Sequence, residues 1–364
     1  MLWRVASPPP HPTGSHLQAS ADMTTEPSRR PRLPLKTLLK VLITGILLFL
    51  LYRKVDGRAF ARLFAKMDWR WPPLFMAIAF ANMGISSVRW RLFLTADGVD
   101  VPTAKLFASH WIASFCNFFL PSNVGGDLYR IADIGTKSGS AVRGTASVFM
   151  DRLSGFLAMS FLGFVFPLAG LHRVPRQHWP WLLVPVAFFL AFAGIFALVV
   201  FGQGLLHRLL RLLPGRAGAK AADVANRFLA SVSAYSRRPS VPLLAFGLSL
   251  VFQFLVFVAI WTVGRSLRIP IPFSWFCVFA PLVCILEALP VSINGMGLRE
   301  AAYVVFFGIV FPIVGFDKLA PEGMTAADWA KTCAGAMALC YMALTLAYAL
   351  GGGLLLLRRM FRSA

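Results

Sequence analysis

The sequence has few acidic residues, and few charged residues of any kind for its length. Only 15 of the 364 residues are Asp or Glu, against 36 Lys or Arg, and charged residues make up 14% of the chain. A chain that is 57% hydrophobic, with a mean hydropathy of +0.68, is too apolar for a soluble globular domain and indicates a polytopic membrane protein. The basic residues flank apolar segments, where anionic lipid headgroups lie, so we expect membrane lipids and no nucleic acid as partners. The composition leaves the oligomeric state open.

The common motifs of catalysis, metal binding and nucleotide binding are also missing. The six histidines show no HExxH or other metal-ligand spacing, and there is no GxSxG elbow and no Walker A loop. The five cysteines lie in apolar segments without CxxC spacing, which is typical of buried small side chains. We interpret His110 as a hydrogen-bonded helix residue and not as a base. The sequence thus predicts no enzyme, no cofactor, no metal and no catalytic residues.

The apolar segments divide the chain into two tails and one membrane domain. Residues 1–37 are rich in Pro, Ser and Arg and predict a disordered basic tail, with Met23 as an alternative start. Residues 358–364 form a short basic tail, and 38–357 form the transmembrane domain. Because a segment in hydrocarbon must satisfy its own backbone hydrogen bonds, the apolar segments must be helices. Nine candidates follow one another, at 38–52, 72–92, 103–120, 143–170, 181–201, 241–264, 273–289, 298–316 and 330–357.

The distribution of basic residues predicts the topology. The N-terminal tail, the 202–240 loop and the C-terminal tail are basic, so the positive-inside rule places them, and both termini, on the cytoplasmic side of the inner membrane. The more acidic 313–331 loop then lies outside. Nine spans do not fit this arrangement. We therefore expect one short segment, most plausibly 103–120, to enter and leave on the same side, so that an all-α protein of about eight transmembrane helices remains.

Two polar stretches resemble each other. "LPSNVGGDLYR" at 120–130 and "LPVSINGMGLR" at 289–299 align without gaps as L-P-x4-G-x3-R, and each follows a short apolar segment. Short segments broken by Pro and Gly at corresponding places in two halves are typical of a binding site at a repeat interface. The stretches thus predict two related halves with a shared polar cavity, while two ordinary loops between helices would also explain them.

Charged residues inside apolar segments favour the binding site. Asp151, Arg152 and Glu287 each lie within an apolar segment, where an ionised side chain costs roughly 2.5–3.5 kcal/mol on insertion scales. Internal salt bridges with Arg152 or Arg299 would account for part of this set. A cavity in which Arg130, Arg152 and Arg299 surround a lipid phosphate accounts for more of it, because the guanidinium group binds phosphate oxygens in pairs. Neighbouring glycines would let backbone N–H groups approach the same anion.

These residues also carry a family resemblance. "FLPSNVGGDLYRI", "FMDRLSGF", "LPVSINGMGLREAAYVVFF" and "SVRWRLFL" resemble the flippase-like family of the lysylphosphatidylglycerol synthase transmembrane region, the membrane half of the multiple peptide resistance factor. The resemblance covers about 38–357 and carries the family's motif residues onto this chain. With Asn123 and Glu287 added, the candidate lipid-binding residues are Asn123, Gly125, Gly126, Asp127, Arg130, Asp151, Arg152, Glu287, Asn294, Gly295, Gly297, Arg299 and Glu300.

The resemblance implies lipid movement between leaflets. The expected cargo is an anionic phospholipid or a polyprenyl-type lipid. The chain ends at Ala364, so we do not expect the soluble domain that attaches lysine to phosphatidylglycerol. Two other functions remain compatible with the sequence. One is a membrane-embedded enzyme that acts on a lipid phosphate, with Asp127, Glu287 or Glu300 as acid or base, and the other is a non-transporting partner of a biosynthetic enzyme.

Overall fold

The described part of the chain is helical. The computed structural model describes residues 57–119, 125–169, 179–202, 215–236, 238–288 and 295–363, together with isolated positions between these ranges. Its α-helices are α2 (Gly57–Ala65), α3 (Trp71–Ala96), α4 (Thr103–Phe119), α5 (Gly125–Ser138), α6 (Ala141–Ala169), α7 (Trp179–Phe201), α9 (Gly215–Ser236), α10 (Ser240–Ser266), α11 (Phe273–Ala288), α12 (Leu298–Val314) and α13 (Ala326–Ser363). A short 3-10 helix, η4 (Asp317–Leu319), precedes α13.

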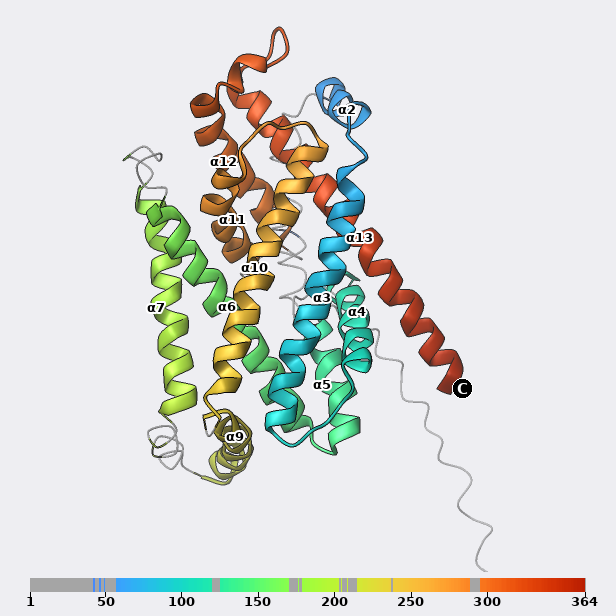
Figure 1. The fold of residues 1–364 in the computed structure, drawn as a ribbon, viewed down its shortest axis with the longest axis vertical. Helices are drawn as coiled ribbons and strands as arrows, with labels where there is room; N and C mark the ends of the chain where they lie inside the picture. The colour runs from blue at the N-terminus through green and yellow to red at the C-terminus, as the bar shows by residue number, and fades with distance from the viewer. Residues whose placement is uncertain are drawn as a thin grey trace, which may run out of the picture.

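Four of these helices are long and apolar enough to cross a membrane. They are α3, α6, α10 and α13, and all run along the long axis of the bundle, with α7 beside α6 (Figure 1). At 26 residues or more they exceed the roughly 20 residues that a bilayer core requires. The predicted all-helical polytopic membrane protein is confirmed. The predicted first span at 38–52 lies almost entirely outside the described residues.

The predicted same-side segment is one arm of a helical hairpin. α4 and α5 form an antiparallel pair that reaches only part of the way along the bundle (Figure 1). Both open ends of the hairpin lie at the end of the bundle that carries α9, where the C-terminus of α3 and the N-terminus of α6 also meet, with Arg143 4.0 Å from Asp97. The sequence analysis did not anticipate α5 as a helix, because "GGDLYRIADIGTKS" has no long apolar run.

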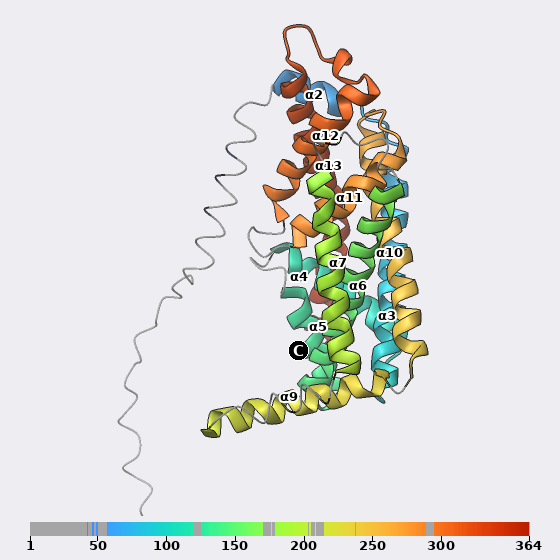
Figure 2. The ribbon, with the colours of Figure 1, turned by 90° about the vertical axis from the view of Figure 1, so that its left-hand side faces the viewer.

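A second hairpin enters the bundle from the opposite end. α11 and α12, which the sequence analysis lists among the candidate spans, pack against each other in the upper half of the bundle (Figures 1 and 2). α11 begins shortly after the end of α10, where the Ser266 carbonyl accepts a hydrogen bond from the Asp68 amide just before α3. The two arms have 16 and 17 residues, or about 24–26 Å at 1.5 Å per residue, which is short of the roughly 30 Å of a bilayer core.

The two hairpins belong to an inverted repeat. In the first half, α3 runs downward, the α4–α5 hairpin enters from below and α6 runs upward (Figure 1). In the second half, α10 runs upward, the α11–α12 hairpin enters from above and α13 runs downward. The helix contacts follow the same symmetry, in which α4, α5 and α6 correspond to α11, α12 and α13. The first arm of each hairpin contacts the last helix of the other half, and the second arm contacts the last helix of its own half. α3 and α10 pack against each other at the centre. The two halves predicted from the sequence are therefore present, with opposite orientation.

Close backbone packing holds each hairpin together. An added Cβ at Gly126 would lie 2.3 Å from the carbonyl oxygen of Ala113, and the Gly126 N–H donates to Asn117 Oδ1 over 2.7 Å. At the aligned Gly295, where φ is +71°, an added Cβ would lie 2.9 Å from Cγ of Glu287. The aligned glycines thus occupy equivalent places, where the second arm of each hairpin crosses the first.

We expect Gly126→Ala to destabilise the first hairpin. The methyl group would displace α5 from the backbone of α4, and overpacking of this kind costs about 1–3 kcal/mol. Thermal melting of the detergent-solubilised variant measures the effect. Gly84→Ala on α3 is the matched control, because an added Cβ there has no heavy atom within 4 Å. A Gly126→Ala protein as stable as the Gly84→Ala protein would contradict the close contact.

Candidate functional site

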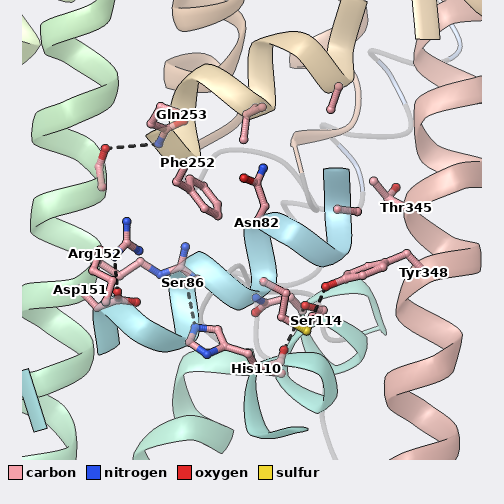
Figure 3. A pocket seen from close by; sticks show the side chains of 18 of the residues that line it. Asn82, Ser86, His110, Ser114, Asp151, Arg152, Phe252, Gln253, Thr345 and Tyr348 are labelled. Carbon is pink, nitrogen blue, oxygen red and sulfur yellow. Dashed lines mark hydrogen bonds and ion pairs between the residues drawn. The ribbon is translucent and has the colours of Figure 1, made fainter. Parts of the chain in front are cut away.

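A polar cavity lies in the middle of the bundle. It has a volume of about 360 Å³ and is lined by residues of α3, α4, α5, α6, α10 and α13 (Figure 3). The tip of the first hairpin forms one side of the cavity, where Asn117 and Asp127 lie close to the interruption between α4 and α5. The cavity therefore lies where the inverted repeat brings its two halves together, which is where transporters of this architecture bind their cargo.

Asp151 joins two buried arginines on one wall of the cavity. Its two oxygens lie 2.6 Å from Nε of Arg89 and 2.8 Å from Nη2 of Arg130, and all three side chains are at least 94% buried. Arg89 also donates to the Ser249 hydroxyl over 2.9 Å, and Arg130 stacks on the Trp90 ring at 4.1 Å. These contacts hold both guanidinium groups rigidly beside the cavity.

Asp127 holds the third arginine. Both of its oxygens accept hydrogen bonds from Arg152, at 2.9 and 3.0 Å, in a bidentate pair. Asp127 is also 3.5 Å from Nη1 of Arg130, which links the two pairs. The Arg152 side chain remains 45% exposed, whereas those of Arg89 and Arg130 are almost fully buried. Arg152 is therefore the guanidinium that an entering anion can reach most easily.

The rest of the lining includes polar but uncharged side chains, which we call the neutral wall. Asn82 and Ser86 on α3, Gln253 on α10, and Thr345 and Tyr348 on α13 face this part of the cavity (Figure 3). His110 accompanies them, with Nε2 3.0 Å from the Ser86 hydroxyl, so its predicted place as a hydrogen-bonded helix residue is confirmed. The charged wall and the neutral wall give the cavity two chemically different sides.

A second charged cluster lies at the tip of the second hairpin. Nη1 of Arg299 is 3.3 Å from Glu287, and Nη2 is 3.6 Å from Glu300. Glu300 also accepts a hydrogen bond from the backbone N–H of Gly297, the N-cap residue of α12, where a carboxylate is favoured by the helix dipole. Arg299 is buried, and its guanidinium lies 5.1 Å from the centre of the Tyr341 ring.

The structure corrects the predicted arrangement of the arginines. Arg130 and Arg152 line the cavity, as predicted, but Arg299 does not; it lies behind Tyr341, which does. Arg89 on α3 takes the third position. The two arginines hold different positions in their helices, since Arg299 is the second residue of α12 and Arg130 is the sixth residue of α5. Arg299 pairs with Glu287 at the end of α11.

The two clusters have opposite net charge. Three arginines and two aspartates leave one positive charge at the cavity, whereas one arginine and two glutamates leave one negative charge at the second cluster. Of the salt bridges considered from the sequence, that of Glu287 with Arg299 is present, whereas Asp151 pairs with Arg89 and Arg130, and Arg152 pairs with Asp127. An ionised group without a partner would be costly in the membrane interior, so the pairs account for the intramembrane charge while leaving the cavity positive.

The remaining predicted residues lie around these clusters or outside the described residues. Gly125 is the first residue of α5 and is buried, like Gly126. Asn123 and Asn294 belong to segments that are not described. Most of the neutral wall cannot be predicted from the sequence. Asn82 is the clearest example, because a single amide in a long apolar helix is an ordinary observation until the fold places it in a cavity. In the described part of the chain, no group of His, Cys, Asp and Glu is arranged to hold a metal ion.

Comparison with protein families identifies the chain's relatives. Residues 37–317 match the model of the family described as the lysylphosphatidylglycerol synthase TM region. The chain belongs to this family. It is therefore a membrane protein of a family associated with lipid-related processes, as the motif resemblance implied. The matched region of the lysylphosphatidylglycerol synthase TM family ends before α13, which supplies Tyr341, Thr345 and Tyr348 to the cavity. The curated proteins and the solved structures give no match.

Proposed function

We propose that this protein is a lipid translocase that moves a phosphate-bearing lipid between the leaflets of the membrane. The observation that carries the proposal is the cavity itself, where three arginines face only two aspartates at mid-bundle. A phosphodiester anion would neutralise the remaining positive charge and would accept the paired hydrogen bonds that a guanidinium group donates. Arg152 would make the first contact with the phosphate, and the buried Arg89 and Arg130 would keep the electrostatic potential of the cavity positive.

The inverted repeat supports movement rather than storage. In transporters with inverted repeats, the two halves exchange conformations around a fixed central site, which then opens to one side and to the other in turn. Here the hairpins enter from opposite ends, and Tyr341 on α13 lines the cavity and also contacts Arg299 of the second cluster. We propose that the cavity is open to a different leaflet in each of the two conformations.

We also propose an orientation for the membrane domain. The end of the bundle with α9 and the C-terminus carries basic residues such as Arg227, Arg358 and Arg359, whereas the loop from Gly315 to Thr325 at the other end carries Asp317, Lys318 and Glu322. By the positive-inside rule, the α9 end faces the cytoplasm, and the protein lies in the cytoplasmic membrane. The C-terminus would then be cytoplasmic, and so would the N-terminus if residues 38–52 form the span predicted from the sequence.

A transfer assay tests the proposed function. Purified protein in vesicles is expected to move fluorescent phosphatidylglycerol between leaflets faster than protein-free vesicles, and mass spectrometry is expected to show lipids of unchanged mass. A lipid of new mass would support an enzyme that acts on the lipid phosphate. Neither transfer nor a new product would support a non-transporting membrane partner. Each of these last two results would refute the translocase.

We expect Arg152→Gln to slow this transfer. The change removes the most exposed guanidinium and leaves Arg89 and Arg130 balanced by two aspartates, so the fold should remain stable while the anion loses a charge-assisted contact. Such a contact is worth about 1.5–3 kcal/mol, and its loss also removes the net positive charge of the cavity, so transfer should fall roughly tenfold to a hundredfold. Arg91→Gln is the matched control, because Arg91 forms an exposed pair with Asp100 at the end of α3. Equal transfer rates in the two variants would contradict a role for Arg152.

A further inference from the structure

We propose that the cavity selects an anionic phosphodiester lipid whose headgroup is a neutral alcohol with free hydroxyl groups, such as glycerol or a sugar. This inference rests on the proposed translocase function and names the substrate class of the same site. It depends on the neutral wall, which phosphate binding alone does not explain, and on the size of the net charge of the cavity, which matches a single phosphodiester.

Asn82 is the residue on which the selection depends. Its side chain points into the cavity and is only 8% exposed (Figure 3). Its carbonyl oxygen Oδ1 is buried and has no hydrogen-bond partner among the described residues. A buried amide oxygen that lacks a donor costs about 1–3 kcal/mol. An entering ligand that donates a hydrogen bond at this point would recover that cost.

Other neutral groups surround the same point. Gln253 on α10 also lines the cavity, and its Nε2 makes only a 3.3 Å contact with the Gly155 carbonyl of α6. The Thr345 hydroxyl donates to backbone carbonyls of its own helix, which leaves its oxygen able to accept. Amide and hydroxyl groups both donate and accept, and this matches hydroxyl groups, which do the same.

The charge of the cavity argues against an amine headgroup. With three arginines and two aspartates, the lining of the cavity carries one net positive charge. One phosphodiester reduces this charge to zero, whereas a phosphodiester with an attached ammonium group leaves it at plus one inside the membrane, where net charge is costly. The described neutral wall also offers no carboxylate to an ammonium group. A headgroup that carries hydroxyls and no further charge fits both walls.

The rest of the lining favours a lipid over a free headgroup. Phe75, Phe156, Phe252 and Val256 border the polar groups, so the site continues into apolar surface that can contact the glycerol backbone and the first methylenes of acyl chains. The deacylated headgroup, glycerophosphoglycerol, has the same polar chemistry without those chains. We therefore expect the lipid and not the soluble diester to occupy the site.

Three lipids that differ in one feature each test the selection. Phosphatidylglycerol has the phosphodiester and hydroxyls, phosphatidylethanol has the same charge without hydroxyls, and phosphatidylethanolamine adds an ammonium group. We expect phosphatidylglycerol to be transferred roughly tenfold faster than each of the others, because a site that binds a hydroxyl rejects an analogue without one. Excess glycerophosphoglycerol should not compete.

The variant Asn82→Leu assigns the selection to one side chain. It should lower phosphatidylglycerol transfer more than phosphatidylethanol transfer, so that the difference between the two lipids is lost, while Asn82→Ser, which keeps a hydrogen-bonding group, should retain part of the preference. A melting curve shows that each variant is folded. Asn226→Leu on α9, away from the cavity, is the matched control and should behave like the unmodified protein.

Each contrary result has a separate meaning. Equal transfer of phosphatidylglycerol and phosphatidylethanol by the unmodified protein, or a preference that survives Asn82→Leu, overturns the hydroxyl selection but leaves the translocase intact. Rapid transfer of phosphatidylethanolamine overturns the charge argument. Full competition by glycerophosphoglycerol overturns the assignment to a lipid. Absence of transfer for every lipid refutes the proposed function itself and this inference with it.

Discussion

Replacing Arg299 with alanine is expected to destabilise the protein by about 3–5 kcal/mol, the usual cost of removing one partner from a buried ion pair. Arg299 is the only cation among the described groups of the second cluster and is paired with Glu287 and Glu300. Its removal would leave two carboxylates close together in the membrane domain. The expected result is a sharp fall in the melting temperature and in the yield of monodisperse protein.

Two further variants make this expectation specific. Arg359→Ala breaks a partly exposed pair with Asp133 and a hydrogen bond to the Tyr129 hydroxyl at the end of α13, and should cost only about 1 kcal/mol. Arg299→Ala combined with Glu287→Gln returns the cluster to its original net charge and should recover part of the lost stability. An Arg299→Ala protein that melts like the Arg359→Ala protein would show that Glu287 and Glu300 do not destabilise the fold when their cation is removed.

Much of the fold can be predicted from hydrophobicity, because a bilayer imposes helices and a minimum length on them. The candidate segments 72–92, 143–170 and 241–264 correspond closely to α3, α6 and α10. The equivalence of the two polar stretches is also real, since Gly126 and Gly295 occupy the same place in the two hairpins. Of the described residues in the two stretches, only those of the first line the cavity.

The direction of the second half could not be predicted from the repeat alone. An ungapped match of "LPSNVGGDLYR" with "LPVSINGMGLR" does not say whether two hairpins enter from the same end or from opposite ends. That depends on the number of crossings between them, and thus on α6, α7 and α10. Once the second hairpin enters from the far side, Arg299 pairs with a glutamate of its own hairpin and packs behind Tyr341, so equal sequence positions acquire different surroundings.

The sequence predicts that charged residues line the site, but it does not identify all of them. Charged residues in apolar helices must face inward and pair, which identifies Asp151 and Arg152. Which helix supplies the additional arginine depends on the rotation of α3 about its axis, and this rotation follows from packing against α10 and α4. Arg89 is buried and Arg91 exposed, although only Trp90 separates them in the sequence.

Replacing Arg130 with alanine should have the opposite outcome to Arg299→Ala: a folded protein that no longer moves lipid. Without Arg130, Asp127 remains paired with Arg152 and Asp151 with Arg89, so no buried carboxylate is left without a cation. The cavity, however, loses its net positive charge. A phosphodiester would then bring in an uncompensated negative charge, and we expect transfer to fall roughly a hundredfold or more, since 1.4 kcal/mol corresponds to tenfold.

Substitution by lysine separates charge from geometry at this position. Arg130→Lys restores the charge but loses the planar guanidinium group that stacks on Trp90 and contacts both aspartates. We expect transfer between that of the alanine variant and the unmodified protein. A purely structural ion pair predicts a different pattern, in which Arg130→Ala loses thermal stability and Arg130→Lys transfers at nearly the normal rate.

A double variant provides the strictest form of this test. Arg130→Ala combined with Asp127→Asn leaves Arg89 and Arg152 facing Asp151 alone, which returns one net positive charge to the cavity without restoring either lost side chain. If the net charge is what receives the lipid phosphate, the double variant should transfer lipid faster than Arg130→Ala alone. The measurements are leaflet-to-leaflet transfer in vesicles and a melting curve for each protein. A double variant that is no faster than Arg130→Ala, at equal stability, would mean that the position of the Arg130 guanidinium, and not the charge of the cavity, controls transfer.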